Sequence, residues 1–265
     1  MGSRISVNGT NFNIHDTLPH WFWSDVQNGR WEPETFRLFD RLLTPHSRFV
    51  DIGAWIGPTS LYAAQKCGSV DAYECDPVAL GALRLNIAAN PDLLHRYRLH
   101  EHAVGDEDAF IKIHSAEFGN SMTSIYHRQQ RGTAVLQHPQ SIQVGMRDAR
   151  ALFREKGYAA DARTFIKMDV EGAEFRILPR ISDVIANSRC IWFISFHEWN
   201  LNPENLPVEP FRAAQMINVL SVFASLNWYT PDLVKLDPQD VFDRVMKRTW
   251  RVQMSLVFSA SALEP

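Results

Sequence analysis

The chain has 265 residues, 45% of them hydrophobic and 22% charged, with a formal net charge of −3. These values are typical of a soluble globular protein and give no electrostatic reason to expect a nucleic-acid partner. No apolar run reaches the roughly 18 residues of a transmembrane helix, and the N-terminus lacks the layout of a secretory signal. We therefore expect a cytoplasmic protein with no membrane partner.

Residues 1–47 form an N-terminal lead-in, which is rich in aromatic residues and lacks the alternation of strands and helices predicted for the rest of the chain. An amphipathic helix is predicted from about Pro33 to Leu43, with Phe36 and Phe39 on the face that docks on the body of the protein. An aromatic cluster precedes it, formed by Trp21, Phe22, Trp23 and Trp31. This cluster either packs in the interior or covers a ligand cleft, and we favour packing.

From residue 48 to the end, short β-rich apolar runs alternate with stretches of helical spacing. This alternation predicts one α/β domain, a doubly wound and mostly parallel sheet with helices on both faces. The last two strands follow the last helix and indicate an antiparallel edge. The predicted strands are Arg48–Ile52, Val70–Glu74, Arg98–Val104, Thr164–Asp169, Ile191–His197, about 228–236, and the segment WRVQMSLVFSA at 250–260.

Helices are predicted at 59–66, from Pro77 to Asn90 and near 210–226. Residues 106–140 break the rhythm and are interpreted as an insert. The insert contains a possible hairpin within AFIKIHSAEFGNSMTSIY, followed by a polar stretch, HRQQRGTAVLQHPQ, that is typical of a mobile loop.

The residue types in the turn after the first strand of the sheet indicate which class of nucleotide cofactor this turn would bind. Its glycines, Gly53 and Gly57, have the spacing G-x-x-x-G, and Trp55 stands where a dinucleotide turn needs a glycine close to pyrophosphate. Asp51 ends the strand, and its charge would repel phosphates but suit a cationic ligand. S-adenosylmethionine is such a ligand, because it carries an ammonium and a sulfonium and no phosphate. Glu74 follows the turn by about 20 residues, the sequence separation typical of an acid that binds the ribose.

Several motifs along the chain resemble those of the FkbM-type S-adenosylmethionine-dependent methyltransferases. They are FVDIGAWIGPTSLYA, AYECDP, HAVGD and IKMDVEGAEFRIL, with WEPETFRLFDRLL similar to the usual lead-in. The resemblance covers about residues 31–200, and DVEGAE is its most specific part. It implies the class I methyltransferase fold, Rossmann-like with seven strands, and methyl transfer, most often to oxygen on small molecules or sugars of secondary metabolism.

By position, the resemblance also implies the cofactor contacts. It places the methionine side at Asp51, Gly53, Ala54 and Gly57. It places the ribose at Glu74, with Cys75 and Asp76 beside it, and the adenine next to Ala103, Val104 and Asp106. Departures from the family pattern lie mainly in 109–150 and after Trp199, and these regions are expected to choose the acceptor.

Methylation of a hydroxyl needs an aligned acceptor and a group that takes its proton. Asp169 closes the fourth strand of the sheet and is the first candidate, since a carboxylate beside the cofactor cleft can hold the ammonium of the cofactor, a substrate hydroxyl or a metal. Glu171 follows two residues later, and His197 ends the next strand as a candidate general base. Together with Glu198 these residues would supply hard metal ligands if they converged. Because the sequence does not show convergence, we predict no metal.

The leading hypothesis for the function is an O-methyltransferase that acts on a hydroxyl of a small natural product or sugar, and three alternative functions remain. A carboxylate acceptor, giving a methyl ester, would need little or no base. An NAD-dependent oxidoreductase is disfavoured by Trp55, and a cofactor-binding module without turnover is the third alternative. DVEG in place of [DN]-P-P-[YFW] after the fourth strand weighs against methylation of nucleic-acid bases.

Overall fold

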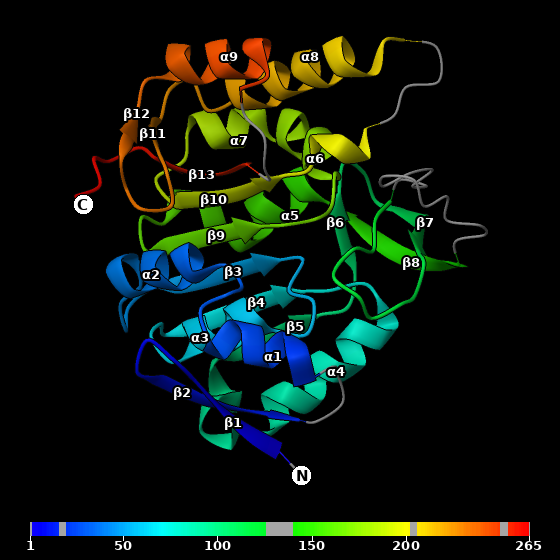
Figure 1. Cartoon of the computed structure of the whole chain (residues 1–265), viewed down its shortest axis with the longest axis vertical. Helices are drawn as coiled ribbons and strands as arrows, with labels where there is room; N and C mark the ends of the chain where they lie inside the picture. Colours follow the sequence, from blue (N-terminus) through cyan, green and yellow to red (C-terminus); the bar gives the residue numbers. More distant parts are fainter. Residues whose placement is uncertain (1, 16–19, 126–139, 202–205, 250–253, 265) are drawn as a thin grey trace.

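The computed structural model describes residues 2–15, 20–125, 140–201, 206–249 and 254–264. At its centre is a sheet of eight strands (Figure 1). These are β3 (Arg48–Ile52), β4 (Ser69–Tyr73), β5 (Tyr97–His100), β9 (Thr164–Met168), β10 (Ile191–Phe196), β11 (Asn227–Tyr229), β12 (Lys235–Leu236) and β13 (Met254–Ser259). The order across the sheet is β12-β11-β13-β10-β9-β3-β4-β5.

Neighbouring strands from β5 to β10 pair in parallel, which confirms the predicted mostly parallel sheet. The two predicted terminal strands do pair antiparallel, as β11 and β13, on this side of the sheet. The order differs in detail, because β13 lies between β10 and β11, and β12, antiparallel to β11, adds an eighth strand at the edge where seven strands were expected. The segment expected as one strand at 228–236 turns back through a hydrogen bond from Thr230 N to Val234 O (2.9 Å), so that it forms both β11 and β12.

Helices cover both faces of this sheet, as predicted. One face carries α1 (His20–Gln27), α2 (Pro33–Leu42), α3 (Pro58–Ala64) and α4 (Pro77–Ala88). The other carries α5 (Ala149–Lys156), α6 (Glu174–Arg180), α7 (Ser182–Ala186), α8 (Val208–Ser221) and α9 (Pro238–Lys247). Short 3-10 turns lie at η1 (Pro91–Arg96), η2 (Tyr158–Ala160) and η3 (Glu198–Asn200). The helix α9 was not expected from the sequence.

Strand residues alternate between these two layers because successive side chains point to opposite faces. Phe165 and Phe193 pack beneath α2, whereas their neighbours Ile166 and Trp192 pack beneath the opposite helices. All four side chains are buried. The carboxyl ends of the parallel strands are therefore held at one rigid edge.

The N-terminal lead-in contains the predicted helix as α2 but begins with a β-hairpin that was not predicted. Strands β1 (Gly2–Val7) and β2 (Thr10–His15) are joined at Asn8 and Gly9, both with positive φ (45° and 77°). An Asn-Gly pair between alternating apolar residues is a hairpin signal, and it was present in the sequence. The hairpin is tied to α4, since Asn86 Oδ1 accepts from His15 N at 2.7 Å.

The insert forms a second, three-stranded sheet of β6 (Ala103–Gly105), β8 (Gln140–Asp148) and β7 (Ala109–Ser115), in that order. Its hairpin pairs β7 with β8, so the predicted pairing within 109–126 was wrong except for one bridge between His114 and Ser124. The predicted strand 98–104 is divided between β5 and β6, which belong to different sheets. The polar stretch expected to be a mobile loop lies outside the described residues from 127 to 139.

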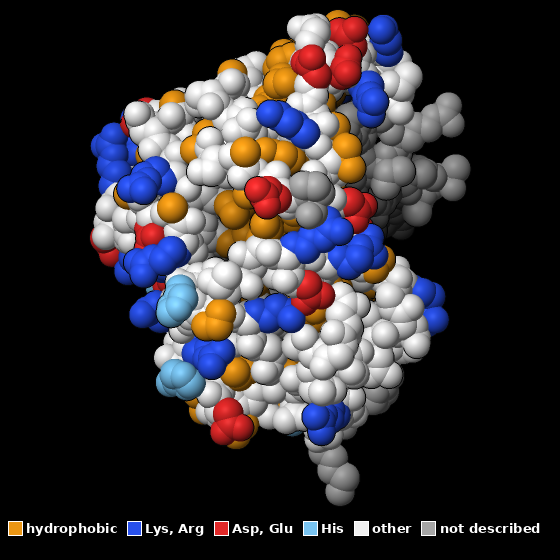
Figure 2. Space-filling view, turned by 90° about the vertical axis from the view of Figure 1, so that its left-hand side faces the viewer, with side chains coloured by type: hydrophobic (Ala, Val, Ile, Leu, Met, Phe, Trp, Pro, Cys, Tyr) orange, Lys and Arg blue, Asp and Glu red, His pale blue; other side chains and the backbone are white. Residues whose placement is uncertain are grey.

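The face on which the parallel strands begin carries Lys and Arg side chains with Asp, Glu and apolar residues between them (Figure 2). Near the starts of the strands, Arg163, before β9, pairs with Asp161 at 2.9 Å, and Arg98 of β5 pairs with Asp71 at 3.5 Å. Mixed, paired charge of this kind is typical of a solvated surface. No helix in the described part of the chain is long and apolar enough to cross a membrane.

Candidate active site

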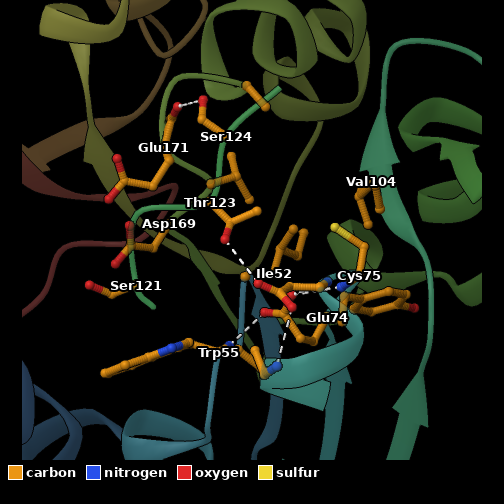
Figure 3. A pocket seen from close by; sticks show the side chains of 18 of the residues that line it. Ile52, Trp55, Glu74, Cys75, Val104, Ser121, Thr123, Ser124, Asp169 and Glu171 are labelled. Carbon is orange, nitrogen blue, oxygen red and sulfur yellow. Dashed lines mark hydrogen bonds between the residues drawn. The ribbon is translucent and has the colours of Figure 1, made fainter. Parts of the chain in front are cut away.

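A cavity with an empty volume of about 1110 Å³, part of it open to solvent, lies at the carboxyl ends of β3, β4 and β9. Its walls come from the turns after these strands, from β6, from the insert and from the start of α2 (Figure 3). Ligands of open α/β sheets bind at this edge, so the cavity is the candidate active site.

The glycine turn after β3 forms one side of the cavity. Gly53 has a φ of 85°, and a Cβ added there would lie 1.9 Å from the Asp169 carbonyl oxygen, so only glycine fits. Gly57 has a φ of 93° and begins α3, while Ala54 lies between the two with its amide donating to Tyr73 O at 3.0 Å. Trp55 also has a positive φ, 50°, and its side chain lines the cavity.

Glu74 follows β4 and is surrounded by backbone amides (Figure 3). Its Oε1 accepts from Cys75 N and Asp76 N, both at 2.7 Å, and its Oε2 accepts from Trp55 N at 2.8 Å. Burial raises the pKa of the Glu74 carboxyl to about 7, although these three amide donors lower it. A carboxylate has about four acceptor positions, so Oε2 keeps one for a ligand hydroxyl.

Asp76 ties the insert to the body of the protein. Its Oδ1 caps α4 by accepting from Val78 N at 2.8 Å, and its Oδ2 accepts from Gly119 N at 2.7 Å and Thr123 Oγ1 at 2.9 Å. Trp55 holds the same loop, since its Nε1 donates to Gly119 O at 2.7 Å. Asp76 thus builds the wall of the cavity, a structural role in addition to the predicted one next to the ribose.

The opposite end of the cavity, near Cys75 and Val104, is largely apolar (Figure 3). Ala103, Val104, Ile113 and Ile125 line it. Burial raises the pKa of the Cys75 thiol well above its usual value, and the nearby carboxylates of Glu74 and Asp76 raise it further. Asp106, expected beside the adenine, instead pairs with Arg176 at 2.8 Å and does not line the cavity.

A buried lysine that sequence reasoning missed lies between two of the predicted acids. Lys167 Nζ is 3.3 Å from Asp51 Oδ1 and 3.5 Å from Asp169 Oδ2. Asp51 is fully buried, accepts a further bond from Thr59 Oγ1 at 2.8 Å and does not line the cavity. The expectation that Asp51 offers a bare charge to a cationic ligand was therefore wrong, because Lys167 already pairs with it. A lysine inside an apolar strand was the available signal.

His197 is the centre of a second buried network. Its Nε2 is 3.2 Å from Asp169 Oδ1 and 3.8 Å from Glu171 Oε1, and its Nδ1 is 3.1 Å from Glu174 Oε1. Burial alone would lower the pKa of His197, but Glu174 and Asp169 outweigh it and raise the pKa well above its usual value. Both ring nitrogens of His197 face carboxylate oxygens, and this arrangement favours a positioning role; the role as general base stays a prediction.

Asp169 and Glu171 face the cavity, at the end opposite Val104 (Figure 3). Burial alone would raise the pKa of Asp169, but Lys167 and His197 outweigh it and hold the pKa below its usual range. Glu171 Oε2 accepts from Asn200 Nδ2 at 3.1 Å. Glu198, the fourth acid considered for a metal, lines a separate cavity beside Arg212. Among the described residues, no group of three or more acids, histidines and cysteines has metal-binding geometry.

Backbone strain gathers at this cavity. Glu32, Trp55 and Glu171 line it, and all three have a positive φ (42°, 50° and 52°) that L-residues with large side chains rarely adopt. Such strain is found mostly at functional sites. Glu32 was not predicted as a site residue, because its place at the cavity depends on how the lead-in packs against the ends of β3 and β9.

Comparison with known protein families identifies the family of the chain. The model of the FkbM methyltransferase domain matches residues 51–217, which include the glycine turn, Glu74 and the acids after β9. The chain belongs to the FkbM methyltransferase family. No curated protein matches it in sequence.

Solved methyltransferase structures resemble the chain at low identity. The FkbM methyltransferase from Methylobacillus flagellatus KT is 16% identical, with a TM-score of 0.45 over 90% of this chain, which spans 60% of that one. The precorrin-6y C5,15-methyltransferase from Geobacter metallireducens GS-15 is 16% identical (TM-score 0.35, 69% and 67% covered). A geranyl diphosphate methyltransferase is 11% identical (TM-score 0.41, 91% and 87% covered). These scores say nothing about the acceptor of this FkbM chain.

The glycine turn leads to a stability prediction. Gly53→Ala should lower the free energy of unfolding by about 2 kcal/mol or more, because the new Cβ meets a backbone oxygen at a positive φ. Urea denaturation measures the change. The matched control is Gly81→Ala in α4, whose Cβ would meet nothing within 4 Å and which should stabilise by about 0.5–1 kcal/mol. Equal stability of the two variants would contradict the account.

The state of His197 can be measured directly. Below its usual pKa of about 6.5 a histidine is charged even when unfolded, so its stabilising contribution is full there and is lost only as the pH rises through the elevated folded-state pKa. At pH 8 we expect both ring nitrogens of His197 to carry protons in nitrogen-detected NMR spectra. His102, whose pKa burial lowers, is the neutral reference. A neutral His197 ring at pH 7.5 would support its role as general base.

Proposed function

We propose that the chain is an S-adenosylmethionine-dependent methyltransferase that methylates a hydroxyl of a small natural product or sugar. The turn after β3 carries the proposal. There Trp55, with its side chain in the cavity and its amide bound by Glu74, occupies the position at which a pyrophosphate would require close backbone approach. This supports a nucleoside ligand without phosphates, and family membership supports methyl transfer.

The cavity residues fit the parts of S-adenosylmethionine. The apolar end at Ala103 and Val104 would hold the adenine, and the remaining acceptor position of Glu74 would take a ribose hydroxyl. The methionine part would lie along the glycine turn toward Asp169. Bound there, S-adenosylmethionine would supply an activated methyl group on its sulfonium.

The chain's own task is to orient the acceptor and receive its proton. Asp169 is the ionised carboxylate that faces the cavity with its orientation fixed, one oxygen by His197 and the other by Lys167. It would accept a hydrogen bond from the acceptor hydroxyl and take the proton as the new C–O bond makes that hydroxyl strongly acidic. A carboxylate with a depressed pKa is sufficient for so late a proton transfer.

The alternative is transfer to a carboxylate to form a methyl ester. A carboxylate acceptor is already ionised and needs no base, but the ionised Asp169 would repel it and has no proton to donate to it, so Asp169 supports the hydroxyl acceptor. An oxidoreductase is disfavoured by Trp55, as argued for the turn. A module without turnover would keep cofactor binding but would not depend on Asp169.

Calorimetric titration tests the cofactor. We expect S-adenosylmethionine to bind with a micromolar dissociation constant, about −8 kcal/mol. NAD serves as the control ligand and should not bind, since its pyrophosphate meets Trp55. Absence of S-adenosylmethionine binding to the folded protein would refute the proposed function.

Transfer of a labelled methyl group to a panel of phenols, sugars and carboxylic acids tests the acceptor. With a hydroxyl acceptor, Asp169→Asn should lower kcat by about 10²-fold or more while S-adenosylmethionine binding changes little. Asp106→Asn, which breaks only the surface pair with Arg176, is the matched control and should keep its activity. Equal loss of activity in both variants would show that Asp169 has no direct part in the reaction.

A further inference from the structure

Most acids around the cavity are already bound by protein donors. Glu74 accepts three amides, Asp76 accepts amides on both oxygens, and Asp169 contacts Lys167 and His197. Glu171 is held by Asn200. Each of these four carboxylates therefore already has a partner within the protein.

Glu32 differs from them. It lines the cavity from the N-terminus of α2, and among the described residues its carboxylate has one hydrogen-bond donor, the neutral hydroxyl of Thr35 at 3.1 Å. No cation of the described chain forms an ion pair with it. Its backbone is left-handed, with φ 42° and ψ 50°, a conformation that L-residues with large side chains rarely adopt.

The charged groups that act on Glu32 come from two elements. Asp169 and Lys167 act from the end of β9, and Glu34 acts from α2 itself. Burial raises the pKa of Glu32 to about 7, and Asp169 raises it further, while Lys167 and the Thr35 hydroxyl oppose them. Because Lys167 is itself paired with two carboxylates, this end of the cavity is negative overall.

We propose that Glu32 binds the ammonium group of the methionine part of S-adenosylmethionine. The proposal rests on the proposed function and assigns a further cofactor-binding residue to it. An ammonium donates three hydrogen bonds and matches a carboxylate with free acceptor positions, whereas a sulfonium donates none. Asp169 and Lys167 act on Glu32, which lines the same cavity. Asp169 lies at the end of the cavity opposite Val104 (Figure 3).

Binding of this ammonium is expected to release protons from Glu32. Free Glu32 is about half protonated at pH 7, and an adjacent cation favours its charged form, so binding releases part of a proton. Affinity for the ammonium therefore weakens as the pH falls below about 7, because the ligand must then displace a proton.

Calorimetry in buffers of different ionisation enthalpy measures this release. Three ligands separate the groups: S-adenosylmethionine, S-adenosylhomocysteine, which keeps the ammonium without the sulfonium, and 5′-methylthioadenosine, which has neither. At pH 7 we expect about half a proton to be released with the first two and less with the third, which reports any contribution of Glu74.

Glu32→Gln preserves the shape of the residue and removes its charge, and Glu34→Gln, two residues along and not at the cavity, is the matched control. In Glu32→Gln we expect the extra proton release to disappear and the affinity for S-adenosylhomocysteine to fall by about tenfold or more, with methylthioadenosine binding unchanged.

Three outcomes would overturn the assignment: unchanged affinity and proton release in Glu32→Gln, equal effects in Glu34→Gln, or proton release with S-adenosylmethionine alone. The last would identify the sulfonium as the partner of Glu32. If the wild-type protein binds none of the three ligands, the proposed function itself fails, and that result is distinct from binding without the Glu32 signature.

Discussion

The contact on which the site depends is the one that Lys167 makes with Asp51 and Asp169. The three residues bring together the ends of two adjacent parallel strands, in which Asp51 pairs in register with Lys167. Removing one member of a buried ion pair typically costs about 3–5 kcal/mol, since the charge left behind has no solvent. The glycine turn after β3 and the acid after β9 are thereby fixed against each other, and Gly53 permits their close approach.

The order of elements and the place of the site could be predicted from the sequence, because both follow from short-range patterns. Apolar runs ending in Asp51, Glu74 and Asp169 reveal strands whose carboxyl ends meet at one edge. The partners of those acids are long-range contacts and left no comparable pattern. Thus Asp51 turned out to be paired with Lys167, and His197, from a separate strand, proved to be held between carboxylates.

The parts of the fold that were not predicted from the sequence can also be traced to particular segments. The Asn8-Gly9 turn was a readable hairpin signal, but the aromatic residues that follow it drew the interpretation toward a helical lead-in. Strand β8 was missed because residues 116–139 separate it along the chain from its partner β7, which lies near the start of the insert. Pairing over such a distance is decided by tertiary packing, and local propensity carries little information about it.

Trp55 connects the two segments added to the core fold. Its ring packs edge-on against Phe22 of α1 at 4.5 Å between centroids, and its Nε1 holds the insert through Gly119. The cofactor turn, the lead-in and the insert therefore meet at one side chain. A change in any one of them reaches the cavity through that residue.

The attachment of the insert by Asp76 bears on how acceptor preference can diverge. The carboxylate that caps α4 also holds the Gly119 amide and the Thr123 hydroxyl, so this wall of the cavity and α4 share one anchor. A new insert grafted from a relative would be compatible only if it brought equivalents of those two donors. Of these two donors only the Thr123 hydroxyl depends on the side chain, because the Gly119 donor is a backbone amide that every residue except proline has.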